Sequence, residues 1–93
     1  MAQYAVKYEV TLPDLPQAEG EKMLHEGIVP MAKAQAGFVN GIWMRQVESP
    51  RDAVAVVVFD TEAHARDAAE QLRPPPGGPV VKTVEVHEVG AQA

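Results

Sequence analysis

Cysteine is absent from this chain of 93 residues, and basic residues are scarce. Without cysteine the protein cannot form disulfides, thiolate metal sites or iron–sulfur clusters, and it has no cysteine nucleophile. Eight Lys and Arg residues stand against thirteen Asp and Glu, which gives a net charge of −5. A nucleic-acid partner is therefore not expected, because phosphate binding requires clustered basic side chains.

No apolar stretch is long enough to suggest a membrane span, although 46% of the residues are hydrophobic and 23% are charged. This balance is too apolar for a disordered chain and too mixed for a membrane segment. The first eight residues lack a basic start and an apolar core, so no signal peptide is expected and the predicted location is cytoplasmic. The length predicts one domain over residues 1–93, and so small a domain favours self-association because it buries a limited share of its surface.

The spacing of apolar residues predicts four strands and two helices. The strands are expected at 4–12, 38–47, 53–59 and 80–89, and the helices at 16–36 and 61–72. This β-α-β-β-α-β order predicts an α+β, ferredoxin-like domain, in which a four-stranded antiparallel sheet carries both helices on one face. The first and third strands are expected in the centre of that sheet.

Three local features sharpen this prediction. Pro30 should kink or split the first helix near Gly27, because proline removes one internal hydrogen bond. In the last strand, Val80, Val84 and Val86 are expected on one side. The third strand is apolar on both faces, whereas the helices cover only one face of the sheet. We therefore expect a second copy of the chain to cover the other face and form a homodimer.

Two blocks of the sequence carry a family resemblance. The first consists of Val29-Pro30, Ala34-Gln35-Ala36-Gly37-Phe38-Val39-Asn40-Gly41 and Trp43-Met44-Arg45. The second consists of Val56-Val57-Val58-Phe59-Asp60-Thr61-Glu62 followed by Ala65, Ala68 and Ala69. Together they resemble the antibiotic biosynthesis monooxygenase-like proteins. The resemblance implies a dimeric α/β barrel whose two sheets meet face to face. It also implies an activity among cofactor-independent oxygenases of polycyclic phenols and quinols, or among haem-degrading enzymes.

The haem-degrading branch of this family uses an asparagine in the first strand, a tryptophan near the end of the third strand and a histidine in the second helix. Here only His64, in the second predicted helix, matches that set. The resemblance therefore favours the cofactor-independent branch, and no cofactor is expected.

Candidate site residues follow from this resemblance and from their side-chain chemistry. His25 or His64 is predicted as a catalytic base, because the histidine pKa lies near neutrality. Strand alternation places Asn40 on one face with Phe38 and Ile42, and Asn40 is predicted to orient the substrate by hydrogen bonding. The expected substrate contacts are Trp43, Tyr8, Phe38 and Arg45.

Structural roles remain open for the same residues. Each histidine is also explained as a partly buried side chain bonded to backbone or water, and Trp43 as a packing residue of the barrel. Asn40 is equally explained by a bond to a neighbouring loop. The three histidines lack the spacing of metal ligands, so no metal site is predicted. Gly77-Gly78 is not a phosphate loop, because no Lys-Ser/Thr follows it.

The first and last strands should be neighbours, which would bring together the polar residues Lys7, Glu9, Glu85 and His87. These side chains form either a solvated patch of ion pairs or a carboxylate–histidine pair for proton transfer.

Two functions remain in competition. One is a small oxygenase that binds a planar apolar molecule between the helices and the sheet. The other is a non-catalytic dimer of the same fold that binds a ligand or a partner. A cavity of roughly 300 Å3 or more that reaches His25 or Asn40 would favour the first function.

Overall fold

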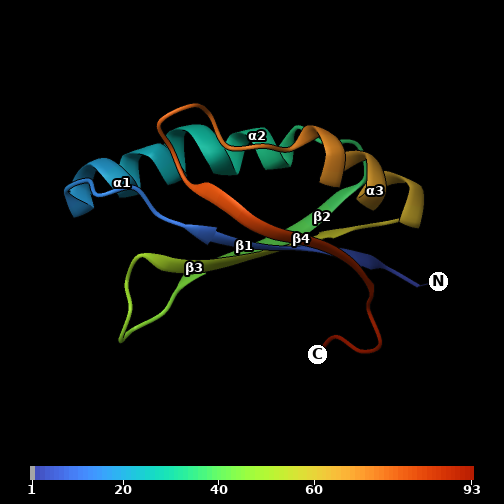
Figure 1. The fold of residues 1–93 in the computed structure, drawn as a ribbon. Coiled ribbons are helices and arrows are strands. Elements are labelled where there is room, and N and C mark those ends of the chain that lie inside the picture. Colours follow the sequence, from blue (N-terminus) through green and yellow to red (C-terminus); the bar gives the residue numbers. More distant parts are fainter. Residues whose placement is uncertain (1) are drawn as a thin grey trace.

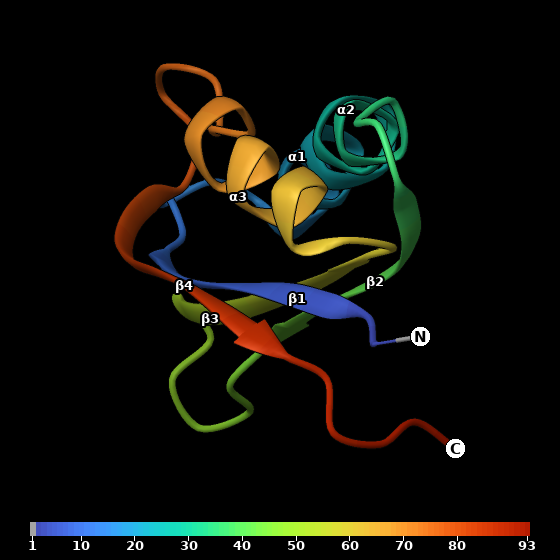
Figure 2. The ribbon, with the colours of Figure 1, turned by 90° about the vertical axis from the view of Figure 1, so that its right-hand side faces the viewer.

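The helices of this protein lie together on one face of a four-stranded sheet, as Figures 1 and 2 show. The computed structural model describes residues 2–93. Its elements are β1 (Tyr4–Thr11), α1 (Gln17–Met23), η1 (Leu24–Ile28), α2 (Val29–Lys33), β2 (Phe38–Arg45), β3 (Asp52–Phe59), α3 (Glu62–Gln71) and β4 (Val80–Glu88). The strand order is β2-β3-β1-β4 with antiparallel neighbours. The predicted α+β, ferredoxin-like class is confirmed, with β1 and β3 in the centre.

The core lies between the sheet and the helices. Its strand side consists of alternate residues of β1 and β3, among them Val6, Val57 and Phe59, which are at most 1% exposed. Its helix side is built from small residues, because Ala32, Ala65 and Ala68 are also buried. Small side chains let α2 and α3 approach the sheet closely, so the large residues that fill this layer come from the strands.

The first predicted helix is continuous in backbone conformation but irregular at its centre. Its middle turn, η1, is a π-helix, and the residues on both sides of it have helical φ and ψ angles. Pro30 lies two residues after the end of this turn and has no N–H with which to continue the regular hydrogen-bond ladder. The disturbance predicted near Gly27 therefore takes the form of a widened turn.

A register shift in β2 separates two residues that simple alternation places together. The pairing with β3 shifts between Phe38 and Asn40. Phe38 consequently packs on the helix side, where its ring meets that of Phe59 edge to face with centroids 6.4 Å apart. Asn40 is exposed and aligns with Ile42 on the opposite face of the sheet. Phe38 and Asn40 were predicted on the same face, and the extra residue at the shift explains the difference.

A second register shift, between Glu9 and Val10 in the pairing of β1 with β4, changes the face of the sheet on which the first residues of β4 lie. Val81 packs against the core, whereas Val80 is 65% exposed. The prediction that Val80 lies on one side with Val84 and Val86 is therefore wrong. The alternation holds for Val84 and Val86, which both contact the core, and fails beyond the bulge.

The face of the sheet turned away from the helices, here called the open face, is half apolar and half polar. Its apolar half lies on β2 and β3, where Ile42 is 58% exposed and Met44 is 49% exposed. By strand register the apolar half consists of Ile42, Met44, Val54, Val56 and Val58, and the polar half of Lys7, Glu9, Thr83, Glu85 and His87. Within residues 2–93, no helix is long and apolar enough to cross a membrane.

Candidate functional site

A cavity of about 410 Å3 lies between the first helix and the sheet. Its floor comes from the strands and includes Tyr8, Val10, Trp43, Ala55 and Val57; its roof comes from the helix and includes Met23, Leu24, His25, Ile28 and Met31. Apolar side chains predominate on both sides. The volume exceeds the roughly 300 Å3 named above as favouring the first function, and the cavity reaches His25 but not Asn40.

The space exists because the first half of the helix does not close on the sheet. No residue of α1 or η1 is buried, whereas α2 buries Ala32 against the core. Met23, Leu24 and Ile28 are only partly covered and border the cavity. The apolar surface that the helical spacing predicts for this segment is therefore the lining of a cavity rather than a packed contact.

Trp43 lies on the cavity floor and also contacts the core. Its ring folds back over Gly41, since a Cβ atom at that position would lie 2.7 Å from Cη2 of the indole. Glycine at 41 thus gives the indole room to lie along β2. Both predicted roles of Trp43, packing and lining a binding space, are compatible with this placement.

Tyr8 forms part of the same floor, with its hydroxyl directed to α3. The hydroxyl donates a hydrogen bond of 3.2 Å to the carbonyl oxygen of Ala68. Burial raises the pKa of Tyr8 to about 12, while the nearby charge of Arg73 acts in the opposite direction. At neutral pH Tyr8 is therefore a neutral phenol whose O–H group already donates to Ala68. This arrangement suits a residue that lines the cavity rather than one that transfers a proton.

Raising the pH is expected to destabilise the protein through Tyr8. The folded-state pKa of about 12 lies above the ordinary value of 10, so folding favours the neutral phenol. The contribution of Tyr8 to the free energy of unfolding is fully present below pH 10 and is lost as the pH rises through 12. Denaturant unfolding between pH 8 and 12 should show a loss of up to about 2–3 kcal/mol from this group. The Tyr8→Phe variant should lose about 1 kcal/mol at pH 7 and show a flatter alkaline profile. An unchanged alkaline profile in the variant would contradict this assignment.

The other predicted site residues fall into two groups. His25 and Arg45 line the cavity, and both are exposed to solvent. Asn40, Phe38 and His64 are not among the residues that line it. Within residues 2–93, the His25 side chain forms no hydrogen bond or ion pair with protein groups. The structure thus brings together Tyr8, Trp43, His25 and Arg45, and leaves the other three elsewhere.

His64 takes part in a local contact at the start of α3. Its Nδ1 lies 2.6 Å from Oδ1 of Asp60, and its backbone N–H donates to the Thr61 hydroxyl at 3.1 Å. The hydrogen bond from His64 holds the pKa of Asp60 below its ordinary range. Thr61 therefore caps α3, and the His64 ring is already occupied by its contact with Asp60.

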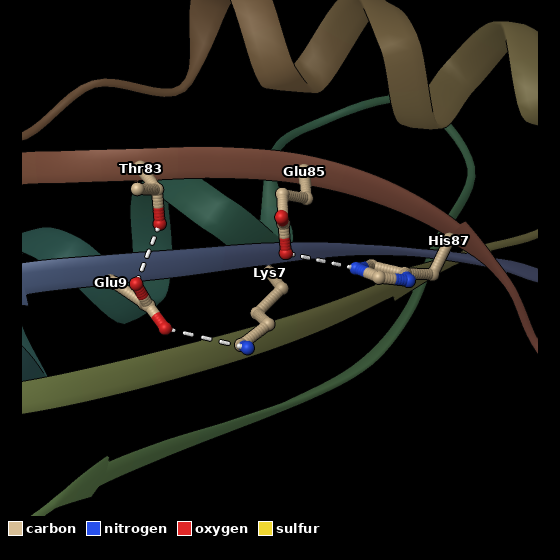
Figure 3. A network of polar contacts seen from close by, with 5 residues as sticks. All are labelled: Lys7, Glu9, Thr83, Glu85 and His87. Carbon is tan, nitrogen blue, oxygen red and sulfur yellow. Dashed lines mark hydrogen bonds and ion pairs between the residues drawn. The ribbon is translucent and has the colours of Figure 1, made fainter.

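The polar half of the open face forms the cluster that strand pairing predicted (Figure 3). Lys7 Nζ lies 3.4 Å from Glu9 Oε1, and the Thr83 hydroxyl donates to Glu9 Oε2 at 2.9 Å. His87 Nε2 lies 3.2 Å from Glu85 Oε1. Hydrogen bonds from Thr83 and Lys7 lower the pKa of Glu9. Because these side chains are about half exposed, the arrangement matches the predicted ion-pair patch.

Two cavity residues could not be predicted as part of a site from the sequence. Arg51 lies in the turn between β2 and β3, and Arg73 follows the end of α3. No spacing relates them to each other or to Arg45, since only the topology brings their segments to one end of the sheet. The one feature of the sequence that sets these residues apart is that arginine is rare, since the chain contains four. Within the described residues, no group of three potential metal ligands occurs.

Solved structures with the same fold include three informative cases. SnoaB, a cofactor-independent oxygenase from Streptomyces nogalater, matches 100% of this chain and 96% of its own, with a TM-score of 0.62 and 19% identity. A proposed antibiotic biosynthesis monooxygenase from Bordetella bronchiseptica matches over the full length of both chains, with a TM-score of 0.65 and 14% identity. A Nitrosomonas europaea protein of unknown function matches 100% of this chain and 94% of its own, with a TM-score of 0.63 and 18% identity. No protein-family model and no curated protein matches the sequence.

Proposed function

We propose, starting from the fold that this chain shares with antibiotic biosynthesis monooxygenase-like proteins, that it is a cofactor-independent oxygenase of phenols or quinols. The observation that carries this proposal is the apolar cavity of about 410 Å3 that Trp43 and His25 both line. A cavity of this size accommodates a planar aromatic molecule. Trp43 offers such a molecule a flat surface, and His25 offers it a titratable nitrogen.

His25 is the proposed base, because it lines the cavity and His64 does not. Its free ring nitrogen would take the proton of a bound phenol or quinol. The resulting anion would then transfer electrons to dioxygen. One oxygen atom would enter the product, and the other would leave as water with the substrate's protons. The chain would orient the substrate and exclude water, which suits an apolar cavity.

Oxygen uptake with a panel of quinols tests this proposal. The His25→Ala variant should lose about a hundredfold or more in rate, the usual contribution of general base catalysis. The His87→Ala variant is the matched control, because His87 lies on the open face, and it should retain the rate. An unchanged rate in His25→Ala would refute the base assignment. A loss confined to His64→Ala would move the base to the start of α3.

The second candidate function is a non-catalytic module that binds a ligand in the same cavity. It is favoured by the isolation of His25 and by the engagement of the Tyr8 hydroxyl with Ala68. This function predicts that calorimetry detects aromatic ligands while no quinol supports oxygen uptake. It also predicts that replacing Trp43 weakens binding and that replacing His25 does not.

The proposal includes a homodimer formed through the open face, in the cytoplasm. The apolar half of the open face, where Ile42 and Met44 are about half exposed, resembles an interface more than an ordinary surface. Two copies related by a twofold axis would each cover the open face of the other. A single interface would then bury the apolar half of both copies.

A further inference from the structure

Three of the four arginines of this protein border the cavity. Of the four in the chain, Arg45, Arg51 and Arg73 all line the cavity, and only Arg66 lies elsewhere. They come from the end of β2, the β2–β3 turn and the loop after α3. In a chain with a net charge of −5, three cations bordering one apolar cavity create a local field opposite to that of the whole molecule.

These cations are available to a ligand. Arg66 is ion-paired with Glu62 at 2.7 Å, whereas Arg45, Arg51 and Arg73 form no ion pair with any carboxylate in residues 2–93. Arg51 uses its Nε–H on the Leu12 carbonyl oxygen at 3.0 Å, which leaves its terminal N–H groups for other acceptors.

The acidic residues nearby do not neutralise them by contact. Asp14 and Glu21 also line the cavity, but neither lies within ion-pair distance of an arginine. Glu21 instead accepts a hydrogen bond of 3.2 Å from the Gln17 amide. The field of Arg73 reaches the inner floor, since its charge opposes the rise in the pKa of Tyr8.

We propose that the cavity binds an aromatic ligand that carries a carboxylate. The ring lies in the apolar interior against Trp43, and the carboxylate meets Arg45, Arg51 and Arg73. The planar guanidinium group matches a carboxylate in geometry and charge, and such charge-assisted hydrogen bonds are the strong ones. A neutral quinol would leave these three cations without a partner. This inference rests on the cavity of the proposed function and narrows its substrate class to aromatic acids.

Isothermal titration calorimetry with two probes tests the inference independently of catalysis. The probes are a hydroxynaphthoate and the corresponding naphthol, which differ only in the carboxylate. The wild type should bind the hydroxynaphthoate at least tenfold more tightly at low salt. This preference should shrink at about 0.5 M salt, because exposed charges are then screened. Arg45→Gln and Arg73→Gln should each weaken hydroxynaphthoate binding about five- to tenfold and change naphthol binding less than twofold.

The matched control is Arg66→Gln, which removes the same charge outside the cavity and should leave both affinities unchanged. Equal binding of the two probes by the wild type, or an equal effect of Arg66→Gln, would overturn the inference. Failure of both probes to bind would overturn it together with the proposed function. A carboxylate preference in a protein that consumes no oxygen with any quinol would support the inference and refute the oxygenase.

Discussion

Replacing Gly37 by alanine is expected to lower the free energy of unfolding by about 2–4 kcal/mol. Gly37 has a φ of 79°, a conformation that costs alanine roughly 1 kcal/mol or more. Its added Cβ would also collide with Oδ1 of Asp60 and Nδ1 of His64. These two atoms contact each other, so they cannot move apart to make room for the new Cβ without losing that contact. The Gly37 carbonyl oxygen also accepts a hydrogen bond of 2.9 Å from the Asp60 backbone.

Urea unfolding followed by circular dichroism, at one fixed protein concentration, measures this loss. Gly20→Ala is the matched control, because an added Cβ in α1 meets nothing within 4 Å. That variant should gain about 0.5–1 kcal/mol from its helical position. Adding His64→Ala to Gly37→Ala should recover part of the loss by opening space. A Gly37→Ala protein as stable as the wild type would show that the Asp60–His64 contact yields without cost.

Replacing Ile42 by aspartate is expected to weaken dimerisation about a hundredfold or more. In the proposed dimer Ile42 lies between two sheets, where an unpaired carboxylate costs about 3 kcal/mol or more. In the separate chain the same side chain is 58% exposed on a strand at the edge of the sheet. The fold itself should therefore tolerate the change, and the effect should appear in association rather than in unfolding of the monomer.

Sedimentation equilibrium at micromolar concentrations gives the result directly. The wild type should sediment at twice the chain mass of 10.0 kDa, and Ile42→Asp at the mass of one chain. Val47→Asp is the control, because Val47 is 91% exposed in the turn between β2 and β3 and should not affect the mass. A wild type that sediments as a single chain would refute the proposed dimer.

The sequence was sufficient for the fold because its apolar pattern is strong where the sheet is regular. The alternation from Tyr4 and the unbroken apolar run from Ala53 to Phe59 place β1 and β3 in the centre. The π-helical turn before Pro30 also lies where proline chemistry predicts a disturbance. Each of these signals depends on residues close together in the chain, and the structure confirms them.

The pattern failed where one extra residue enters a strand. Alternation assumes a period of two, and a bulge reverses the faces beyond it without altering composition. This is why Asn40 was expected on the side of Phe38, and Val80 on the side of Val84. The cavity residues Arg51 and Arg73 were missed for a different reason, since they lie in loops that only the complete topology brings together.

The π-helical turn makes the roof of the cavity adjustable by a change in chain length. A π-turn contains one residue more than the α-helical turn that it replaces. Because the π-turn absorbs this residue within one turn, the segments on either side of it keep the same face toward the sheet. Met23 and Gly20 in α1 therefore lie along the cavity on the side on which α2 packs against the core. Removing one residue from Leu24–Ile28 should restore a regular helical turn and narrow the roof at that point, while the sheet and its core stay the same.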